Sequence, residues 1–490
     1  MQRKSGVLMH ITSLPGKYGS GTFGIEAFNF IDRLKEGGFS LWQTLPFCMP
    51  DSYGSPYSSY SAFSGNPFLI DPDTLVRKGY LTKDEVLPEL QKSPWLCDFE
   101  KLNETRIPLL RLAAKRALSD PFVQREVAAF LERNPEIAEF CHFMALKTAN
   151  HGAPWFDFTT EEADPAEESA WQFMQYEFAL QWAAVRQYAN QNGISLIGDI
   201  PIYVAYDSSD VYANLGSGIF DLDEDGKRKN VAGVPPDFFA EEGQLWGNPL
   251  YQWKTMRKDG FAWWKARLRH LFSQFDGVRI DHFRGLESFW SIPADAETAM
   301  AGKWVKGPGK AFIRMIREVV EEEKQKGHDA FVIAEDLGVI TEEVAELVEY
   351  SGFPGMRVFQ FAFMGDPHSP HLPHNYPENA VAYTGTHDNN TLLAYLWELD
   401  DETRREMLSY CGYDDPNWEA GLSAMIRTVL QSHAAITILP IQDVLGFGAD
   451  TRLNTPGTAT GNWRYRITSE QLASIDMKHF RRLNTLYERV

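Results

Sequence analysis

Short apolar runs recur along the chain, each followed by a polar or Gly/Pro-marked turn. Continuous rather than alternating apolarity is typical of parallel strands that are buried on both faces. The segments between these runs include stretches with apolar residues at helical spacing, at residues 25–37, 170–192, 311–326 and 342–350. Eight strand and helix units predict an α/β fold, the (β/α)8 TIM barrel. The candidate strands are residues 6–10, 41–45, 196–198, 278–280, 331–334, 357–361, 380–383 and 435–439.

Two gaps between the predicted strands are longer than a crossover helix requires. In the first, residues 82–164 have apolar side chains at three- and four-residue steps, which predicts a mainly helical insertion. In the second, residues 205–259 are rich in Asp, Gly, Pro and aromatic residues without a helical period. This composition predicts an irregular, loop-rich insertion over the active face. With these insertions, residues 1–490 form a single catalytic barrel, although the length alone suggests about three domains.

Composition restricts the class of ligand. The chain has 67 Asp and Glu against 47 Lys and Arg, a net charge of −20, so we expect neither a nucleic acid nor an anionic membrane as partner. Aromatic residues make up 13% of the chain, which fits either a large core or stacking surfaces for a sugar. The four cysteines are far apart, without metal-ligand spacing, and the first residues lack a signal-peptide core. We therefore expect a reduced, cytoplasmic protein without a metal.

Carboxylates follow several of the predicted strands, where a barrel builds its chemistry. Asp199, Asp281, Glu335 and Asp388 follow the third, fourth, fifth and seventh strands. A single such carboxylate could cap a helix or bind a nearby arginine. Four at equivalent positions would meet in one pocket, where like charges raise some pKa values and leave others low. This separates an acid from a nucleophile, as glycoside cleavage requires.

Cationic and imidazole side chains accompany these carboxylates. By strand alternation, Arg279 would point to the same barrel face as Asp281. It could hold that carboxylate ionised or form a plain ion pair. His282 and His387 each adjoin a carboxylate, and they could bind sugar hydroxyls or be structural.

Eight segments together resemble the successive motifs of the 4-alpha-glucanotransferases, also called amylomaltases or disproportionating enzymes, family 77 of the glycoside hydrolases. The resemblance extends from about residue 3 to about residue 466. It implies a retaining transglycosylase on a (β/α)8 barrel, with inserted subdomains and no C-terminal β-sandwich. The segments are SLPGKYGSGTFG, SPYSSYSAFSGNP, GDIPIYVA, VAGVPPDFFAEEGQLWGNPLY, DGVRIDHFRG, IAEDLG, TGTHDN and NTPGTATGNWRYR.

The resemblance also implies roles for the carboxylates. Asp281 matches the nucleophile, Glu335 the general acid/base, and Asp388 a third carboxylate that stabilises the distorted sugar ring. Asp199 matches a position that supports the site. Retaining chemistry places the nucleophile and acid carboxyls about 5 to 5.5 Å apart and needs no cofactor.

Loops near these carboxylates are candidates for the substrate groove. The segment 235–248 could be a lid that shields the covalent intermediate from water, or an apolar loop packed on the barrel. Tyr57 could line the groove or pack beneath it, and Tyr53 matches a remote glucan contact of some family members. Trp463, at the end of the late loop, could stack on sugar or only on the barrel. The remaining candidate groove residues are Asp237, Phe238, Phe239, Trp246, Asn248, Asn454 and Pro456.

Together these features predict transfer of a segment of an alpha-1,4-glucan to the 4-hydroxyl of another glucan or of glucose. Maltodextrins or starch-derived glucans would be the substrates, and a covalent glycosyl-enzyme the intermediate. Two alternatives are an alpha-1,4-glucan hydrolase that uses the same carboxylates and a non-catalytic glucan-binding protein. The sequence is compatible with a monomer or a homodimer.

Overall fold

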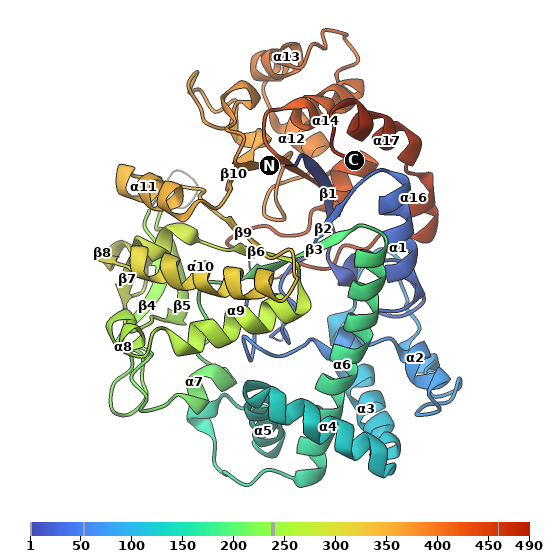
Figure 1. Ribbon diagram of the computed structural model, residues 1–490, viewed down its shortest axis with the longest axis vertical. Coiled ribbons are helices and arrows are strands. Elements are labelled where there is room, and N and C mark those ends of the chain that lie inside the picture. The colour runs from blue at the N-terminus through green and yellow to red at the C-terminus, as the bar shows by residue number, and fades with distance from the viewer. Residues whose placement is uncertain (1, 52–53, 237–240, 459) are drawn as a thin grey trace.

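The computed structural model describes residues 2–51, 54–236, 241–458 and 460–490. Eight parallel strands close into a barrel in which β12 returns to pair with β1, and helices surround it (Figure 1). The predicted (β/α)8 fold is confirmed. In order around the barrel the strands are β1 (Lys4–Leu8), β2 (Leu41–Gln43), β3 (Ser195–Ile200), β6 (Gly277–Ile280), β9 (Phe331–Ala334), β10 (Gly355–Val358), β11 (Ala380–Tyr383) and β12 (Ile436–Pro440).

The barrel strands are buried on both faces. Every residue of β6, β11 and β12 is buried, which explains why these strands read as continuous apolar runs. The sixth strand differs from the prediction, because β10 begins at Gly355 and residues Phe359–Phe361 form a 3-10 helix. Asp336 accepts a hydrogen bond from the Met356 amide, and a Cβ on Gly355 would lie 2.4 Å from that carboxylate. The strand therefore begins two residues before the predicted start, at the glycine that packs against Asp336.

Helices connect the strands and cover the barrel. The N-cap side chain of Asp164 accepts a hydrogen bond from Ala166, and Pro165 begins the long helix α6. After β12, the helix α17 packs against α1 and α14. The covering helices are α1 (Ile25–Glu36), α6 (Pro165–Gln191), α9 (Ala262–Gln274), α10 (Lys310–Gln325), α11 (Glu342–Ser351), α12 (Leu392–Glu398), α13 (Asp401–Tyr410), α14 (Leu422–Gln431), α15 (Ile441–Leu445), α16 (Ser469–Ser474) and α17 (Met477–Leu486).

Between β2 and α6 the chain forms a helical layer at one end of the molecule, seen at the bottom of Figure 1. The helices there are α3 (Phe99–Ala117), α4 (Pro121–Arg133) and α5 (Pro135–Ala149), preceded by the short α2 (Pro72–Arg77). All three of the longer helices pack against α6, which joins this layer to the barrel.

The segment 205–259 is more regular than predicted. It contains two short helices, α7 (Ser209–Ala213) and α8 (Trp253–Lys258), and two strands, β4 (Asn230–Val234) and β5 (Gln244–Pro249). These strands join β7 (Ser288–Pro293) and β8 (Lys303–Lys306) in an antiparallel sheet with the order β5-β4-β7-β8. The irregular interpretation was wrong because β4 pairs with a strand that follows β6, far away in sequence. Much of β5 and β8 is also exposed, so neither has an apolar run.

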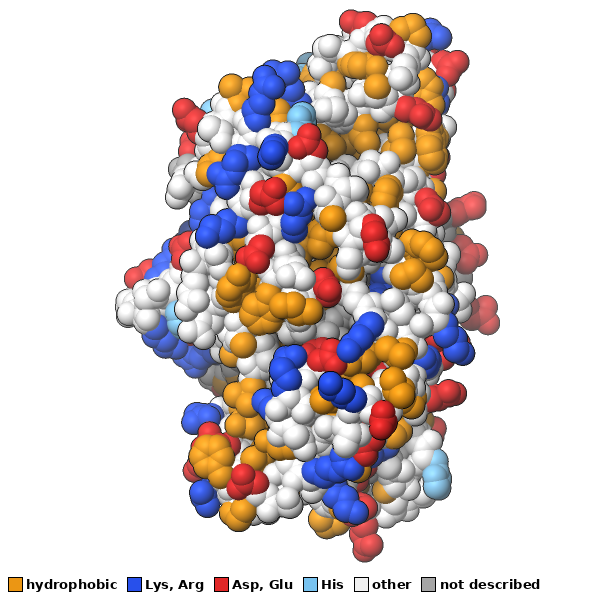
Figure 2. Space-filling model, turned by 90° about the vertical axis from the view of Figure 1, so that its right-hand side faces the viewer, with side chains coloured by type: hydrophobic (Ala, Val, Ile, Leu, Met, Phe, Trp, Pro, Cys, Tyr) orange, Lys and Arg blue, Asp and Glu red, His pale blue; other side chains and the backbone are white. Residues whose placement is uncertain are grey.

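On the face shown in Figure 2, Lys and Arg side chains are interspersed with acidic and hydrophobic ones. This face therefore does not present the concentrated positive charge that binding a polyanion requires. Within the described ranges, no helix has the length and apolarity to cross a bilayer.

Candidate active site

Asp199, Arg279 and Asp281 lie at the carboxyl ends of two neighbouring barrel strands. Because β3 and β6 pair Asp199 with Arg279, these side chains are adjacent. Arg279 Nη1 donates to both carboxylate oxygens of Asp199, at 2.8 and 2.7 Å, and Nη2 donates to Asp281 Oδ1 at 2.9 Å. The side chains of Asp199 and Arg279 are buried, whereas that of Asp281 is 31% exposed. One guanidinium thus joins a buried carboxylate to one that faces the groove.

Arg279 stays protonated although it is buried. Desolvation alone would lower its pKa, but the two aspartates together raise that pKa well above the ordinary value. A positive charge therefore lies 2.9 Å from Asp281 Oδ1. The predicted orientation of Arg279 toward Asp281 is therefore present in the structure.

Glu335 follows β9, next to Asp281. The register pairs Ile280 with Ala334, so Asp281 and Glu335 are the next residues on adjoining strands. Glu335 is 8% exposed, and its carboxylate accepts the amide N–H groups of His282 at 2.7 Å and Leu337 at 2.8 Å. Burial and the negative charge of Asp281 raise the pKa of Glu335 to about 8. The Glu335 carboxyl is therefore protonated at neutral pH. It lies beside Asp281, which accepts a hydrogen bond from Arg279.

The backbone at His282 helps to make this arrangement. Its φ of 49° lies in the left-handed region, which is unusual for a residue other than glycine. In this conformation the amide of His282 reaches Glu335. Burial lowers the pKa of the His282 imidazole to about 4, so the ring is neutral at physiological pH.

The third carboxylate lies across the site from Glu335, on the loop after β11. Asn454 Nδ2 donates to Asp388 Oδ1 at 2.6 Å, and Arg452 Nη2 donates to the Asp388 carbonyl at 2.8 Å. His387 Nε2 is 3.4 Å from Asp388 Oδ2. The Asp388 side chain is 46% exposed, so it is held in position while it remains open to a ligand.

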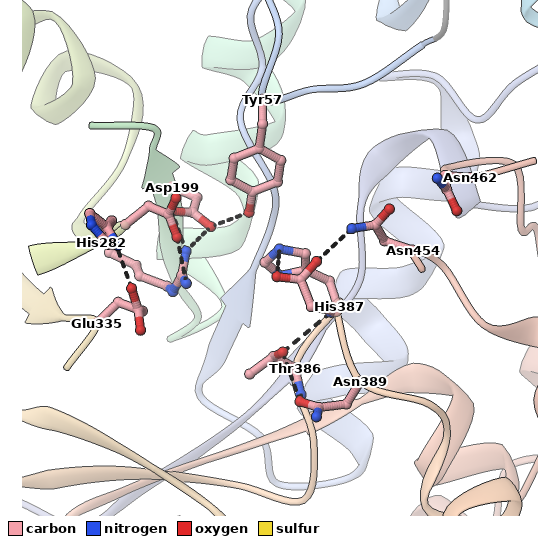
Figure 3. Close-up of polar contacts among 12 residues, drawn as sticks. Tyr57, Asp199, His282, Glu335, Thr386, His387, Asn389, Asn454 and Asn462 are labelled. Carbon is pink, nitrogen blue, oxygen red and sulfur yellow. Dashed lines mark hydrogen bonds and ion pairs between the residues drawn. The ribbon is translucent and has the colours of Figure 1, made fainter. Parts of the chain in front are cut away.

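Tyr57 connects the two sides of the site, as Figure 3 shows. Its hydroxyl donates to Asp199 Oδ2 at 2.6 Å, and its ring stacks on His387 with centroids 5.1 Å apart and an interplanar angle of 15°. Burial and the charge of Asp199 raise the pKa of Tyr57 well above its ordinary value, so the phenol stays a donor. Trp463 is only 8% exposed, and its ring centroid lies 5.6 Å from that of Tyr57 and 5.9 Å from that of His387.

A groove of about 710 Å³ runs over these residues. Hydrogen bonds connect the lining residues Tyr57 and Asp281 to Asp199 and Arg279, which do not line the groove themselves. Glu335 and His282 do not line it either, and the His282 amide donates to Glu335. Of the residues proposed from the sequence, those that line it are Tyr57, Trp246, Asn248, Asp281, His387, Asp388, Asn454, Pro456 and Trp463.

Trp246 and Asn248 form one wall of the groove from β5. The Trp246 side chain is 37% exposed and lies edge to face against His282, with centroids 5.1 Å apart. Asn248 Nδ2 donates to the Val204 carbonyl at 2.8 Å, which fixes β5 beside the chain that follows β3. Four other residues named in the sequence analysis lie outside the described residues: Tyr53, Asp237, Phe238 and Phe239.

Several groove residues were missed from the sequence. Tyr203 and Tyr206 follow Asp199 in the segment PIYVAY, so their place after a barrel strand was a usable signal. Arg228 had no such signal, because it stands in the charged turn DLDEDGKRK far from any strand-end carboxylate. Among the residues that the structure describes, no group of three or more His, Cys, Asp or Glu side chains could hold a metal ion.

Comparison with known proteins agrees with this geometry. The model of the 4-alpha-glucanotransferase family matches residues 9–472. The chain belongs to this family. The family prediction and the predicted glucan transferase function are therefore confirmed. Two curated 4-alpha-glucanotransferases are similar along the whole chain: one from Streptococcus pneumoniae serotype 4 is 42% identical and covered over 98% of its length, and one from Thermus thermophilus is 41% identical and covered over 99%.

A plant relative, the chloroplastic/amyloplastic 4-alpha-glucanotransferase of Arabidopsis thaliana, is 40% identical over the whole chain and is covered over 86% of its length. Among solved structures, the amylomaltase of Streptococcus agalactiae in complex with acarbose has a TM-score of 0.93 and 36% identity, with 99% of both chains covered. The fold therefore occurs in a solved structure of an amylomaltase.

Proposed function

We propose that this 4-alpha-glucanotransferase family member cleaves an alpha-1,4 bond in a maltodextrin and transfers the released segment with retention of configuration. Asp281 is the nucleophile and Glu335 the general acid/base. The observation that carries this proposal is the pair of unlike carboxyls on adjoining strands, one bonded to Arg279 at 2.9 Å and the other with a pKa of about 8. A double displacement requires one carboxyl that attacks the sugar and a second that donates a proton.

In the first step, Asp281 forms a bond to the anomeric carbon of the donor sugar. The bond from that carbon to the glycosidic oxygen breaks, and the Glu335 proton passes to the oxygen, so the leaving glucan departs as a neutral alcohol. Glu335 is then ionised. The positive charge of Arg279 and the amides of His282 and Leu337 stabilise the carboxylates that remain.

In the second step, Glu335 accepts the proton of the 4-hydroxyl of an acceptor sugar. The acceptor oxygen bonds to the anomeric carbon, and the bond to Asp281 breaks. This returns both carboxyls to their starting states. The outcome is transfer when a sugar hydroxyl attacks and hydrolysis when water does. The exposed ring of Trp246 beside His282 provides an apolar surface for an acceptor sugar.

Asp388 and His387 bind hydroxyls of the reacting sugar in this proposal. Both line the groove, and both are fixed from behind, Asp388 by Asn454 and His387 by its stack on Tyr57. A fixed carboxylate that faces the sugar strengthens its hydrogen bonds as positive charge develops on the ring. Asp199, which the groove does not reach, supports Arg279 and Tyr57.

Maltotriose separates transfer from hydrolysis. We expect the purified protein to convert it to glucose and a series of longer glucans while the number of reducing ends stays constant. Labelled glucose added to the reaction should enter the longer products, which tests glucose as acceptor. A rising number of reducing ends without longer products would instead identify the hydrolase.

Substitution of the nucleophile separates an enzyme from a glucan-binding protein. D281N removes the attacking charge, so we expect maltotriose disproportionation to fall about a thousandfold or more. D450N, which changes an exposed aspartate in the same way, is the matched control and should retain activity. Disproportionation by D281N at the wild-type rate would place the chemistry elsewhere.

A cytoplasmic location is also proposed. Cys48, Cys97, Cys141 and Cys411 are all free thiols, which supports a reducing compartment. Whether the active form is a monomer or a homodimer can be measured by light scattering.

A further inference from the structure

The outer part of the groove contains a cation that the catalytic proposal does not use. Arg228 lines the groove together with Tyr206, Trp246 and Gly247. It comes from the turn before β4, whereas Tyr206 follows β3 and Gly247 belongs to β5. Three separate segments therefore meet at this point.

The contacts fix Arg228 in place without neutralising it. Its Nη1 donates to the Gly247 carbonyl at 2.7 Å, and the guanidinium carbon lies 4.2 Å from the centroid of the Tyr206 ring. Tyr206 itself stacks on Phe156, with centroids 5.0 Å apart and an interplanar angle of 18°, and its hydroxyl donates to the Gly226 carbonyl. A cation held over an aromatic ring and anchored to a backbone carbonyl has a defined orientation.

The remaining donors of this guanidinium are available to a ligand. Within the described part of the chain, the bond to Gly247 is the single hydrogen bond that the Arg228 side chain makes. Arginine carries five N–H donors and stays charged at all relevant pH values. A group that binds here must therefore accept hydrogen bonds, and the hydroxyl oxygens of a sugar do so.

Contacts along the groove show how Arg228 is related to the reacting bond. Trp246 packs 5.1 Å from His282, the residue after Asp281, and Gly247 follows Trp246. Tyr203, which also lines the groove, lies 6.3 Å from Trp246 on the side of the chain that leads to Tyr206. Arg228 is therefore bonded to the residue that follows Trp246, and the Trp246 ring in turn packs on the residue that follows Asp281.

We propose that Arg228 forms an outer glucan subsite, in which its guanidinium donates hydrogen bonds to the hydroxyls of a glucose unit beyond Trp246. This inference rests on the proposed function, because it assumes a glucan in the groove. It makes Arg228 a determinant of chain-length preference. Only glucans long enough to extend past Trp246 gain from it.

The test compares R228Q with the wild-type enzyme on maltotriose through maltoheptaose. We expect the loss in kcat/KM to grow with chain length and to reach about tenfold for maltoheptaose, as for hydrogen bonds to a charged donor. R228K keeps the charge but not the planar fork, and should recover part of this loss. K229Q removes the same charge from an exposed neighbour outside the groove lining, and is the matched control.

Three results would overturn the subsite. An equal loss of kcat/KM in R228Q on every chain length would mean that Arg228 only holds Gly247 in position. An unchanged kcat/KM of R228Q on maltoheptaose would mean that Arg228 does not contact the glucan. Inhibition of the wild-type enzyme by inorganic phosphate that R228Q relieves would identify an anion site instead. Failure of the wild-type enzyme to lengthen maltotriose would contradict the proposed function itself, whereas the length dependence of R228Q decides the subsite.

Discussion

At the scale of single residues, the proposed role of Glu335 as general acid predicts the pH range of the reaction. Its folded-state pKa of about 8 lies well above the ordinary value of 4.5 because of burial and the charge of Asp281. The acid form starts the reaction, and it is present below pH 8 and lost above it. We expect kcat/KM for maltotriose to fall about tenfold for each pH unit above 8, as measured in a pH–rate profile.

An activated donor provides the control for this assignment. The leaving group of 4-nitrophenyl α-maltoside departs without protonation, so the fall above pH 8 should disappear for its first step. Burial lowers the pKa of His282 to about 4 and that of His10 to about 3, so neither imidazole titrates near pH 8. A fall near pH 8 that remains with the activated donor would show that another group titrates.

At the scale of elements, one buried carboxylate holds the loop that carries His387 and Asp388. Asp443, on α15, accepts the Thr384 hydroxyl at 2.5 Å and the Leu392 amide at 2.7 Å, and these two residues bracket the loop. We expect D443A to lower kcat/KM for maltotriose about 10- to 100-fold, because small displacements of catalytic groups are costly.

Matched variants test whether the two hydrogen bonds of Asp443 are responsible for the loss. T384V removes one of the two hydrogen bonds and should lower kcat/KM less than D443A does. D443N should keep the hydrogen bond from Leu392, so we expect its kcat/KM to lie between those of T384V and D443A. Circular dichroism checks that the variants are folded. Wild-type kinetics in folded D443A would mean that the loop keeps its position without this carboxylate.

The same scale explains which elements could be predicted from the sequence. Barrel strands are buried on both faces, so all eight could be located from apolar runs, although β1 and β10 each begin two residues before the predicted start. The sheet of β4, β5, β7 and β8 left no such signal, because much of β5 and β8 is exposed and the β4–β7 pair joins distant segments. Local pattern thus predicts parallel strands well and long-range antiparallel pairing poorly.

At the scale of the whole molecule, the barrel brings together what the sequence separates. The carboxylates could be predicted because Asp199 lies near the end of β3 and the other three follow strands, and all strands end at one face. The contacts of Tyr57 with Asp199 and His387 could not be predicted, because Tyr57 belongs to a loop whose position depends on the folded barrel. Arg228 likewise becomes a groove residue only when the antiparallel sheet places Gly247 beside it.

Closure of the barrel depends on a buried cation at the opposite end from the site. Arg489 is fully buried, and its guanidinium donates to the carbonyls of Leu430, Ser432, Ala434, Ala435 and Lys4. The carbonyls of Lys4 and Ala435 lie where β1 and β12 begin, so Arg489 joins the first and last strands. R489M leaves the carbonyls without their donors, and we expect it to lower stability by about 3 kcal/mol.

Urea unfolding followed by tryptophan fluorescence measures this loss as a lower midpoint. V490A changes the exposed neighbouring side chain and should leave the midpoint unchanged. Because the catalytic carboxylates lie at the other end of the strands, folded R489M should keep its kcat/KM for maltotriose at 25 °C. A midpoint for R489M equal to that of V490A would mean that strand pairing alone closes the barrel, and a loss of activity in folded R489M would mean that both ends of the barrel are coupled.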